Sequence, residues 1–358
     1  MTVTRQGLVQ GVRRAYPANQ AFKLGFNSCT IEVQTNHSDL DQALKDYFAP
    51  FVAPGSQTDI LVTVHEAPEQ DLGLDFQLSL SEAGKTRVKE EFCDLSDGRV
   101  VRKRLTGMVF VFGGPDNCAV GSCQDNLNQV VNFINNRYIQ DQLLKGALLG
   151  HAAGVSLEGT GMALAGFSGM GKSTLALKLV EKGAVFVSND RLLISHGQTS
   201  LIMRGVAKLP RINPGTALNN PCLVEIIPED DQKRFSSLEK DKLWDLEQKY
   251  DVPIDVCFGQ GLFKLSAPMQ GLLILNWERK EEPLKIREVD LGTRQDLLPA
   301  FIKEPGLFYL SLFGAGKDFS PRTYLDLLSR CTVLEAAGGV DFAGAREVCL
   351  DFLQSHPG

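Results

Sequence analysis

Residues 151–194 read HAAGVSLEGTGMALAGFSGMGKSTLALKLVEKGAVFVSNDRLLI, and this stretch determines the class of the fold. It begins with two short apolar segments, GVSLEG and TGMALAG, whose glycine-containing connection predicts a β-hairpin. The second segment runs directly into a glycine-rich loop at 166–173, and an apolar helical pattern over 174–182 follows. A strand, a glycine-rich loop and a helix in this order predict an α/β domain that binds phosphates at the loop.

The loop GFSGMGKS matches the pattern G-x-x-x-x-G-K-[ST] at every fixed position. Glycines let the backbone turn sharply and approach a ligand closely, so that several N–H groups can converge on phosphates. The helix that follows adds unpaired N–H groups and the positive end of its dipole. In this pattern Lys172 reaches the β- and γ-phosphates and the Ser173 hydroxyl ligates Mg²⁺. We therefore expect ATP and Mg²⁺ as ligands. The loop residues expected at the nucleotide are Gly166, Ser168, Gly169, Met170, Gly171, Lys172 and Ser173.

Asp190 is the candidate carboxylate for the metal. P-loop enzymes supply such a carboxylate from the end of a neighbouring strand. The helix after the loop is expected to end at Gly183 in the left-handed conformation, and the apolar segment AVFVS then leads to Asn189 and Asp190. Only one helix and one strand separate Lys172 from Asp190, so we expect Asp190 on the strand that returns beside the loop, as Mg²⁺ ligand or as acceptor base. A turn or capping aspartate is the alternative.

The run 151–194 resembles the catalytic core of HPr kinase/phosphorylase and its kinase relatives, in which a histidine opens a strand before the hairpin and loop. Phosphoenolpyruvate carboxykinases share the loop and a nearby acidic pair and are distant relatives. The resemblance covers residues 150–205 most strongly, and the chain resembles the HPr kinase-related branch more than the bifunctional enzyme. It implies a nucleotide contact at Thr174, a place for His151 near the catalytic pocket, Asp190 on the metal, and a homo-oligomer, since HPr kinase relatives assemble into rings.

Asn189 departs from the pattern of that family, which has the first of two aspartates at this position. An amide cannot accept a proton from the acceptor, so the work of a general base would fall to Asp190, to His151 or to no residue. Phosphorolysis of a phosphoserine, the reverse reaction of the family, is therefore expected to be weak or absent. His151 has a second interpretation, as a hydrogen-bonded residue at the start of a strand.

A second departure lies at Ile202, where the family has a glutamate ahead of an Arg-Gly pair, here Arg204 and Gly205. The segment 208–223, KLPRINPGTALNNPCL, is rich in Pro, Asn and Gly and follows shortly after. It predicts an ordered loop beside the γ-phosphate, with Arg204 or Arg211 neutralising charge in the transition state. A surface connection with arginines in salt bridges is the alternative.

The chain is expected to form two domains. Residues 1–123 predict a small α+β domain in which strands dominate, and residues 124–358 predict a P-loop kinase domain of the HPr kinase/phosphoenolpyruvate carboxykinase type with a mixed central sheet. The mixed sheet follows from the hairpin before the loop. Expected strands of the first domain are 29–35, 59–65, 98–105 and 107–114, with a helix near 39–51. Expected elements of the second are a helix from Asp125 or Asn126 to Gly150, strands at 271–277 and 284–291, a turn-rich break at 314–321, and helices at 324–330 and 345–353.

The composition excludes several classes of function. A formal net charge of −6 and the absence of a Lys/Arg-rich run argue against nucleic-acid binding. Eight scattered cysteines without zinc spacing, and an N-terminus without the apolar part of a secretory signal, indicate reduced thiols in a cytoplasmic protein. The longest apolar stretches are too short to span a membrane. The charged segment 228–250 predicts a solvated surface helix, with a partner surface as the alternative.

These observations favour an ATP-dependent kinase acting on a hydroxyl, either a protein serine or a small metabolite such as free serine. No LSGGQ-like or NKxD-like segment occurs, and the short distance from Lys172 to Asp190 is unlike that of transport ATPases. Two alternatives remain: a P-loop ATPase without a transferable acceptor, and a nucleotide-binding regulatory protein that has lost catalysis.

Overall fold

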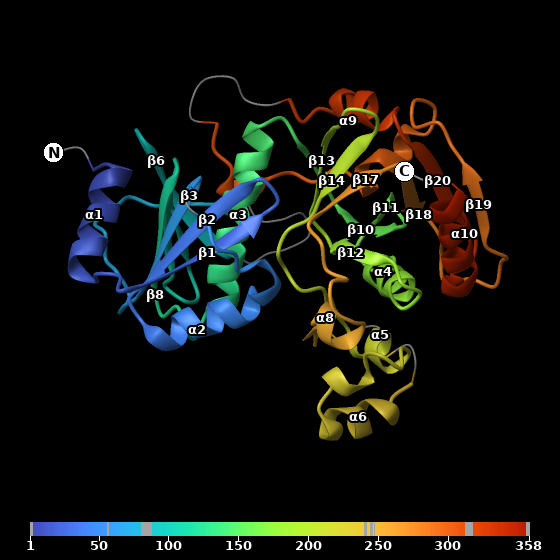
Figure 1. Cartoon of the computed structure of the whole chain (residues 1–358), viewed down its shortest axis with the longest axis horizontal. Coiled ribbons are helices and arrows are strands. Elements are labelled where there is room, and N and C mark those ends of the chain that lie inside the picture. Colours follow the sequence, from blue (N-terminus) through green and yellow to red (C-terminus); the bar gives the residue numbers. More distant parts are fainter. Residues whose placement is uncertain are drawn as a thin grey trace. The chain divides into compact units, whose positions relative to one another are not determined.

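The computed structural model describes residues 3–55, 57–79, 88–239, 242, 243, 246, 248–311 and 318–355. The chain divides into two compact units (Figure 1). The first comprises Met1–Lys145 and Pro305–Lys317, and the second comprises Gly146–Glu304 and Asp318–Gly358. The boundary expected after residue 123 is therefore misplaced. Helix α3 (Leu127–Leu144) belongs to the first unit because it packs there, with the Tyr138 ring edge-on to Phe26 at a centroid distance of 5.4 Å.

The first unit is built on a sheet that has eight strands within the described residues. In spatial order these are β1 (Gln20–Phe26), β2 (Cys29–Thr35), β3 (Ile60–Glu66), β8 (Asp116–Gly121), β7 (Val109–Phe112), β6 (Gly98–Lys103), β5 (Glu90–Leu95) and β4 (Gln77–Leu78). Strand β3 pairs in parallel with both β2 and β8, and the other neighbours are antiparallel. The strand-rich α+β unit expected from the sequence is thus what forms.

Helices cover both faces of this sheet. On β7, Val109 and Val111 belong to the core formed with Val9 of α1 (Arg5–Ala15), whereas the Phe110 ring contacts Phe133 of α3 at 4.9 Å. Because neighbouring residues of a strand point to opposite faces, α1 and α3 lie on opposite sides of the sheet. Helix α2 (Ser38–Tyr47) packs against β1, β2 and α3.

The second unit contains a mixed sheet, as the hairpin before the loop predicts. Within the described residues its strand order is β12 (Val185–Ser188), β10 (Ala152–Leu157), β11 (Thr160–Gly166), β18 (Gly271–Leu275), β20 (Thr332–Ala337) and β19 (Lys285–Glu288). Strands β10 and β11 form the antiparallel hairpin, and β11, β18 and β20 run parallel to one another. The edge strands β12 and β19 pair antiparallel to β10 and β20. The fold is of the α/β P-loop kinase-like type.

This sheet lies between a helical layer and a second sheet. Helices α4 (Lys172–Val180) and α10 (Phe342–Ser355) contact each other and pack on β10 and β11 (Figure 1). On the opposite side lies a sheet of β17 (Ser266–Met269), β14 (Leu201–Arg204), β13 (Leu192–His196) and β9 (Leu148–Gly150). All of β11 is buried because both of its faces are covered. At Gly161 the approach is so close that a Cβ would lie 2.0 Å from the Pro268 carbonyl oxygen.

Two details around α3 differ from expectation. The helix ends at Leu144, and Leu148 lies in β9 rather than extending the helix to Gly150. Gly146 adopts a left-handed φ of 101°, which stops the helix and turns the chain into the strand. Asn126 is the N-cap residue, but its side chain donates to the Ser122 carbonyl at 2.9 Å instead of capping the helix.

Shorter elements complete the second unit. They are β15 (Arg211–Ile212), α5 (Pro214–Leu218), η2 (Val224–Ile226), α6 (Glu229–Ser236), β16 (Tyr250–Asp251), α8 (Ile254–Cys257), η3 (Gln295–Ala300) and α9 (Pro321–Leu328). In the charged segment 228–250, α6 forms with Phe235 buried, while residues 240, 241, 244, 245 and 247 lie outside the described residues. Residues 314–317 of the expected turn-rich break are also outside them. In the described part of the chain, no helix is both long and apolar enough to cross a membrane.

Candidate active site

The glycine-rich loop joins the C-terminal end of β11 to α4, as the sequence predicts. Gly169 and Gly171 have φ values of 84° and 87°, in the left-handed region that favours glycine. Helix α4 begins at Lys172 with Gly171 as its N-cap, and no side chain caps its first N–H groups. The loop therefore presents backbone donors and a positive helix end at the edge of the sheet, which is the arrangement that binds phosphates.

Two aromatic residues that sequence reasoning missed pack against the loop and support it. The Trp277 indole N–H donates to the Met170 carbonyl at 3.0 Å, and the Trp277 and Phe342 rings contact edge-on with centroids 5.1 Å apart. Phe342 also limits position 171, because a Cβ on Gly171 would lie 2.4 Å from its ring. Trp277 is the last residue of the expected strand 271–277 and follows β18 in the structure, but nothing in the pattern indicated its partner in the loop.

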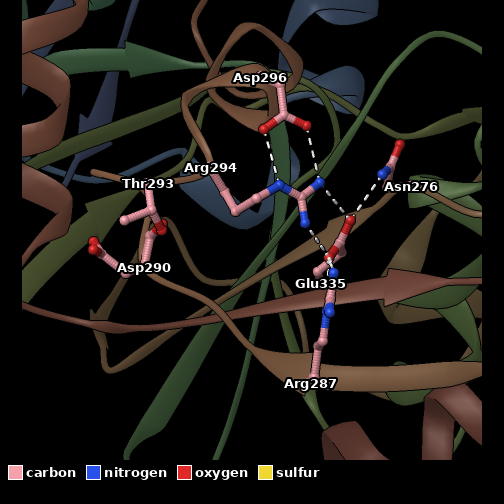
Figure 2. A network of polar contacts seen from close by, with 7 residues as sticks. All are labelled: Asn276, Arg287, Asp290, Thr293, Arg294, Asp296 and Glu335. Carbon is pink, nitrogen blue, oxygen red and sulfur yellow. Dashed lines mark hydrogen bonds and ion pairs between the residues drawn. The ribbon is translucent and has the colours of Figure 1, made fainter.

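A polar network fixes the strand end that carries Trp277 (Figure 2). Glu335 on β20 is 2% exposed and accepts hydrogen bonds from Arg294 at 2.7 and 2.9 Å and from Asn276 at 2.9 Å. These hydrogen bonds, those of Arg294 first, lower the pKa of Glu335 to about 2 against the opposing effect of burial. Asn276 immediately precedes Trp277, so the network supports the loop through its neighbour.

A cavity of about 720 Å³ opens in front of the loop. Of the residues expected at the site, those lining it are His151, Ser168, Gly169, Gly171, Lys172, Ser173, Thr174, Asn189 and Asp190. Gly166, Met170 and Arg204 are not among its lining residues. The structure thus brings together the residue before β10, the loop, α4 and the two residues after β12 around one space.

The position of Asp190 follows from the direction of the strands. The expectation that its strand lies beside the loop strand is wrong, because β10 lies between β12 and β11. Both β11 and β12 are antiparallel to β10, so they run in the same direction and end at the same edge of the sheet. Asp190, two residues after β12, therefore still reaches the cavity that the loop lines.

Lys172 is a buried cation. It is 8% exposed, and its Nζ donates to the carbonyl oxygens of Gly166 at 2.6 Å and Phe167 at 3.2 Å. Burial, followed by the charge of Lys303, lowers the pKa of Lys172 to about 8, although Asp190 opposes the shift. At neutral pH the ammonium therefore remains charged in surroundings that solvate it poorly, which favours pairing with an anion such as phosphate.

Asp190 lies among cations. Its carboxylate pairs with Lys303 at 3.4 Å, and its side chain is 44% exposed. Burial by itself would raise the pKa of Asp190, but Lys303, Arg191 and Lys208 outweigh it and hold the pKa below the ordinary value. The carboxylate is thus ionised at neutral pH and suited to bind a cation. Lys303 lies far along the chain in no recognisable motif, and sequence reasoning missed it together with Lys208.

His151 is a neutral imidazole at physiological pH. Burial, then the charges of Lys172 and Lys303, lowers its pKa to about 4. Its backbone N–H donates to the Phe301 carbonyl at 2.6 Å, which anchors the start of β10. A neutral imidazole can accept a hydrogen bond from a hydroxyl, but a pKa of about 4 makes it a weak base.

Asn189 faces the same cavity, and its Oδ1 is buried without a hydrogen-bond partner among the described residues. Buried polar atoms in native proteins are usually paired, so an unpaired oxygen in a cavity indicates a place where a ligand or water donates a hydrogen bond. Because the amide cannot take up a proton, Asn189 can form hydrogen bonds to a ligand but cannot act as a general base.

The segment expected beside the γ-phosphate does line the cavity, through Lys208, Arg211 and Thr216 among others. Asn213 caps α5 by accepting the Thr216 N–H at 2.9 Å, and the hydroxyls of Thr216 and Thr174 lie 2.9 Å apart. The two candidate arginines differ. Arg211 lines the cavity but pairs with Asp251 at 3.2 Å, whereas Arg204 donates to the Ser195 hydroxyl at 2.6 Å and lines no part of it.

The residues present fit a magnesium nucleotide. The loop offers N–H groups that no side chain caps and Lys172 for phosphates, and Ser173 and Asp190, both with oxygen-bearing side chains, line the same cavity. The described residues contain no group of three His, Cys, Asp or Glu side chains that could hold a metal. Mg²⁺ does not need one, because it usually keeps several waters and takes one or two carboxylates together with phosphate oxygens.

Comparison with known proteins points to one family over part of the chain. No model of a known protein family matches the sequence. HPr kinase/phosphorylase of Mycoplasmopsis pulmonis (strain UAB CTIP) is 50% identical over 85 residues, which is 22% of this chain and 28% of that protein. The HPr(Ser) kinase/phosphatase structure from Coxiella burnetii matches with a TM-score of 0.30 and 12% identity, covering 58% of this chain and 88% of that one. The sequence match supports a relationship to HPr kinase/phosphorylase over those 85 residues, and the chain spans less than a third of that protein's length.

Proposed function

We propose that this relative of HPr kinase/phosphorylase is an ATP-dependent kinase that transfers the γ-phosphoryl group to a hydroxyl of an acceptor. The observation that carries the proposal is the cavity of about 720 Å³, which Lys172, Ser173 and Asp190 line together. A phosphate cradle and an ionised carboxylate at one edge of a mixed sheet are the two parts that phosphoryl transfer requires.

The residues of the chain have distinct roles in this proposal. The N–H groups at the start of α4 and the ammonium of Lys172 bind the phosphates and stabilise the negative charge that they carry. Ser173 and Asp190 are the proposed ligands of Mg²⁺, which would neutralise charge on the phosphates. Asn189 and His151 supply hydrogen bonds at the rim of the reacting groups. Holding the acceptor hydroxyl in line then lowers much of the barrier by proximity.

No strong general base is required for the forward reaction. The low pKa of Asp190 and the pKa of about 4 of His151 make both weak bases at neutral pH. Phosphoryl transfer through a loose transition state depends little on proton removal, so transfer to a hydroxyl is compatible with such groups. Phosphorolysis of a phosphorylated product needs an acid–base group at the attacking phosphate. We therefore propose that the reverse reaction is weak, because Asn189 replaces an aspartate.

The acceptor is a protein serine or a small hydroxyl metabolite such as free serine. Two alternatives use the same loop: an ATPase without a transferable acceptor and a nucleotide-binding regulatory protein. The extent of the cavity favours transfer to an acceptor over these alternatives. Its lining continues beyond the loop to Lys208, Asn219 and Asn220, so residues other than those at the phosphates are present to bind an acceptor. All eight cysteines are free thiols, which supports the proposed cytoplasmic location.

Calorimetric titration with ATP and Mg²⁺, followed by an ADP-release assay, tests the proposal. We expect the unmodified chain to bind, Lys172→Ala to lose most of the affinity, and Lys182→Ala, which changes an exposed lysine after α4, to bind normally. ADP release is then measured with ATP alone, with free serine, and with protein acceptors that contain serine. Release that rises with one acceptor, together with label transfer from γ-³²P-ATP, supports a kinase. Acceptor-independent release would indicate the ATPase, and binding without release the regulatory protein.

A further inference from the structure

A second cavity, independent of the proposed kinase site, lies within the first unit and has a volume of about 330 Å³. Its walls come from the start of β3, the turn between β7 and β8, the C-terminal half of α3 and residues 310–311, all of which belong to that unit. Nothing in the sequence analysis indicated this place, because its residues come from four separate segments.

The cavity is unusual because a buried guanidinium lines it. Arg137 is 3% exposed, and its Cζ lies over the Phe112 ring, 4.0 Å from the ring centroid. Its Nη1 donates to Gln140 Oε1 at 3.2 Å, and its Nη2 donates to the Phe308 carbonyl oxygen. Among the described residues, Nε has no hydrogen-bond partner and no carboxylate pairs with the guanidinium. The groups in contact with the guanidinium, namely Gln140, the Phe308 carbonyl and the Phe112 ring, are thus all neutral.

Such an arrangement is costly without a counter-ion. Burial lowers the pKa of Arg137 to about 9, so the side chain is still a cation at neutral pH. Aromatic rings and single carbonyl oxygens compensate only part of the loss of hydration. A carboxylate in the cavity would supply both the missing charge and an acceptor for the planar N–H groups.

The remaining lining restricts the kind of anion. Asp59 and Asp141 add two carboxylates: Asp59 accepts the Thr30 N–H at 2.7 Å, and Asp141 accepts Lys145 at 2.8 Å. A doubly charged phosphate would be repelled by these carboxylates. A ligand with both a carboxylate and an ammonium group satisfies the two signs of charge together.

The apolar part of the lining sets the side chain of the ligand. Ile60, Leu144 and Leu310 contribute hydrocarbon surface, and Pro115 adds to it. We propose that this cavity binds a free α-amino acid with an apolar side chain, its carboxylate on Arg137 and its ammonium group toward Asp59. The volume of about 330 Å³ is within the range of small-ligand sites.

Calorimetric titration of the full chain with L-leucine tests the proposal, with L-valine, L-methionine and L-phenylalanine as further probes. The matched analogues are 4-methylpentanoate, which lacks the ammonium group, 3-methylbutylamine, which lacks the carboxylate, and inorganic phosphate. We expect at least one of the four amino acids to bind. An analogue that lacks its ammonium group, or one that lacks its carboxylate, should have an affinity at least about tenfold lower. The Lys172→Ala variant should bind the amino acid normally, which separates this cavity from the phosphate loop.

Two variants locate the site. Arg137→Lys keeps the charge but loses the planar fork, and we expect about tenfold or greater loss of affinity. Asp59→Asn keeps an oxygen that accepts the Thr30 N–H. We expect this variant to lower the affinity for the amino acid by up to about fivefold and to leave the affinity for 4-methylpentanoate unchanged. Asp46→Asn, on the exposed side of α2, is the matched control and should bind as the unmodified chain does.

The outcomes decide the proposal without ambiguity. Binding by none of the four amino acids at millimolar concentration overturns it, as does phosphate binding more tightly than any of them. If the unmodified chain and Arg137→Lys bind the amino acid with equal affinity, the guanidinium does not bind its carboxylate and the proposal is overturned. If Arg137→Lys does not fold, Asp59→Asn decides: loss of the preference for the amino acid over 4-methylpentanoate supports the proposal, and an unchanged preference overturns it.

Discussion

Replacing Lys172 with methionine should abolish nucleotide binding and yet stabilise the folded protein. The two effects have one cause. Lys172 is 8% exposed and carries a positive charge at neutral pH, although burial has lowered its pKa to about 8 from 10.5. The fold therefore holds a cation that the unfolded chain would solvate better. Methionine fills a similar volume without the charge, so the folded state no longer carries that cost.

The magnitude follows from the pKa. A change from 10.5 to about 8 corresponds to roughly 3 kcal/mol at 1.36 kcal/mol per unit. Methionine also gives up a hydrogen bond to the Gly166 carbonyl, 2.6 Å from Nζ, which is about 1 kcal/mol for a neutral donor. The expected net gain in the free energy of unfolding is about 2 kcal/mol, or about 4–8 °C in Tm for a unit of this size.

The dependence on pH gives the sign of the effect independently. Between pH 8 and 10.5 the unfolded chain keeps a proton on Lys172 that the folded chain has lost, so the stability of the unmodified protein rises with pH in this window. Below pH 8 the destabilisation is fully present. The advantage of the methionine variant should therefore be constant below pH 8, shrink above it, and be lost by pH 10.5.

Thermal melting of Lys172→Met and of the unmodified chain across this range is the assay, with Lys182→Met as the control for an exposed lysine. ATP with Mg²⁺ should raise the Tm of the unmodified protein and of the control but not that of Lys172→Met. A Lys172→Met protein that is less stable at pH 7, with a difference that does not vary between pH 8 and 10.5, would refute the interpretation of Lys172 as a poorly solvated cation.

Three further predictions concern the same site. Asp190→Asn should lower the rate of ADP formation about a hundredfold and raise the Mg²⁺ concentration needed for half-maximal rate; a normal rate would exclude the carboxylate from the reaction. Asn189→Asp should raise the rate of the reverse reaction, measured as pyrophosphate formed from inorganic phosphate and a phosphorylated product, and an unchanged reverse rate would contradict the role of Asn189. Gly171→Ala should lower the free energy of unfolding by about 1–3 kcal/mol, because residue 171 has a φ of 87° and its Cβ would lie 2.4 Å from Phe342. Gly169→Ala, where φ is 84° but the space is open, should lower it less, and urea denaturation measures both values. Equal losses in the two alanine variants would show that Phe342 does not limit the loop.

The local sequence was sufficient for the elements that depend on neighbouring residues. The hairpin 152–166 and the phosphate loop follow from glycine positions and from apolar periodicity within a few residues, and both form as predicted. Gly183 likewise adopts the left-handed φ of 92° expected after α4. The mixed sheet also followed, because a hairpin forces two antiparallel neighbours into the sheet before the parallel strand pairs with it.

Tertiary structure decided everything that depends on residues distant in the chain. Strand β10 lies between β11 and β12 in the sheet. Asp190 still reaches the cavity because β11 and β12 run in the same direction. Lys303 pairs with Asp190, whereas Trp277 and Phe342 pack at the loop. No local sequence pattern marks any of these three positions. Arg204 shows the converse: the sequence offered it, with Arg211 as the alternative, as a cation near the γ-phosphate, but its guanidinium donates to Ser195 instead. Local patterns encode backbone conformation over a few residues, whereas the charge and solvation of a site depend on which distant side chains pack around it.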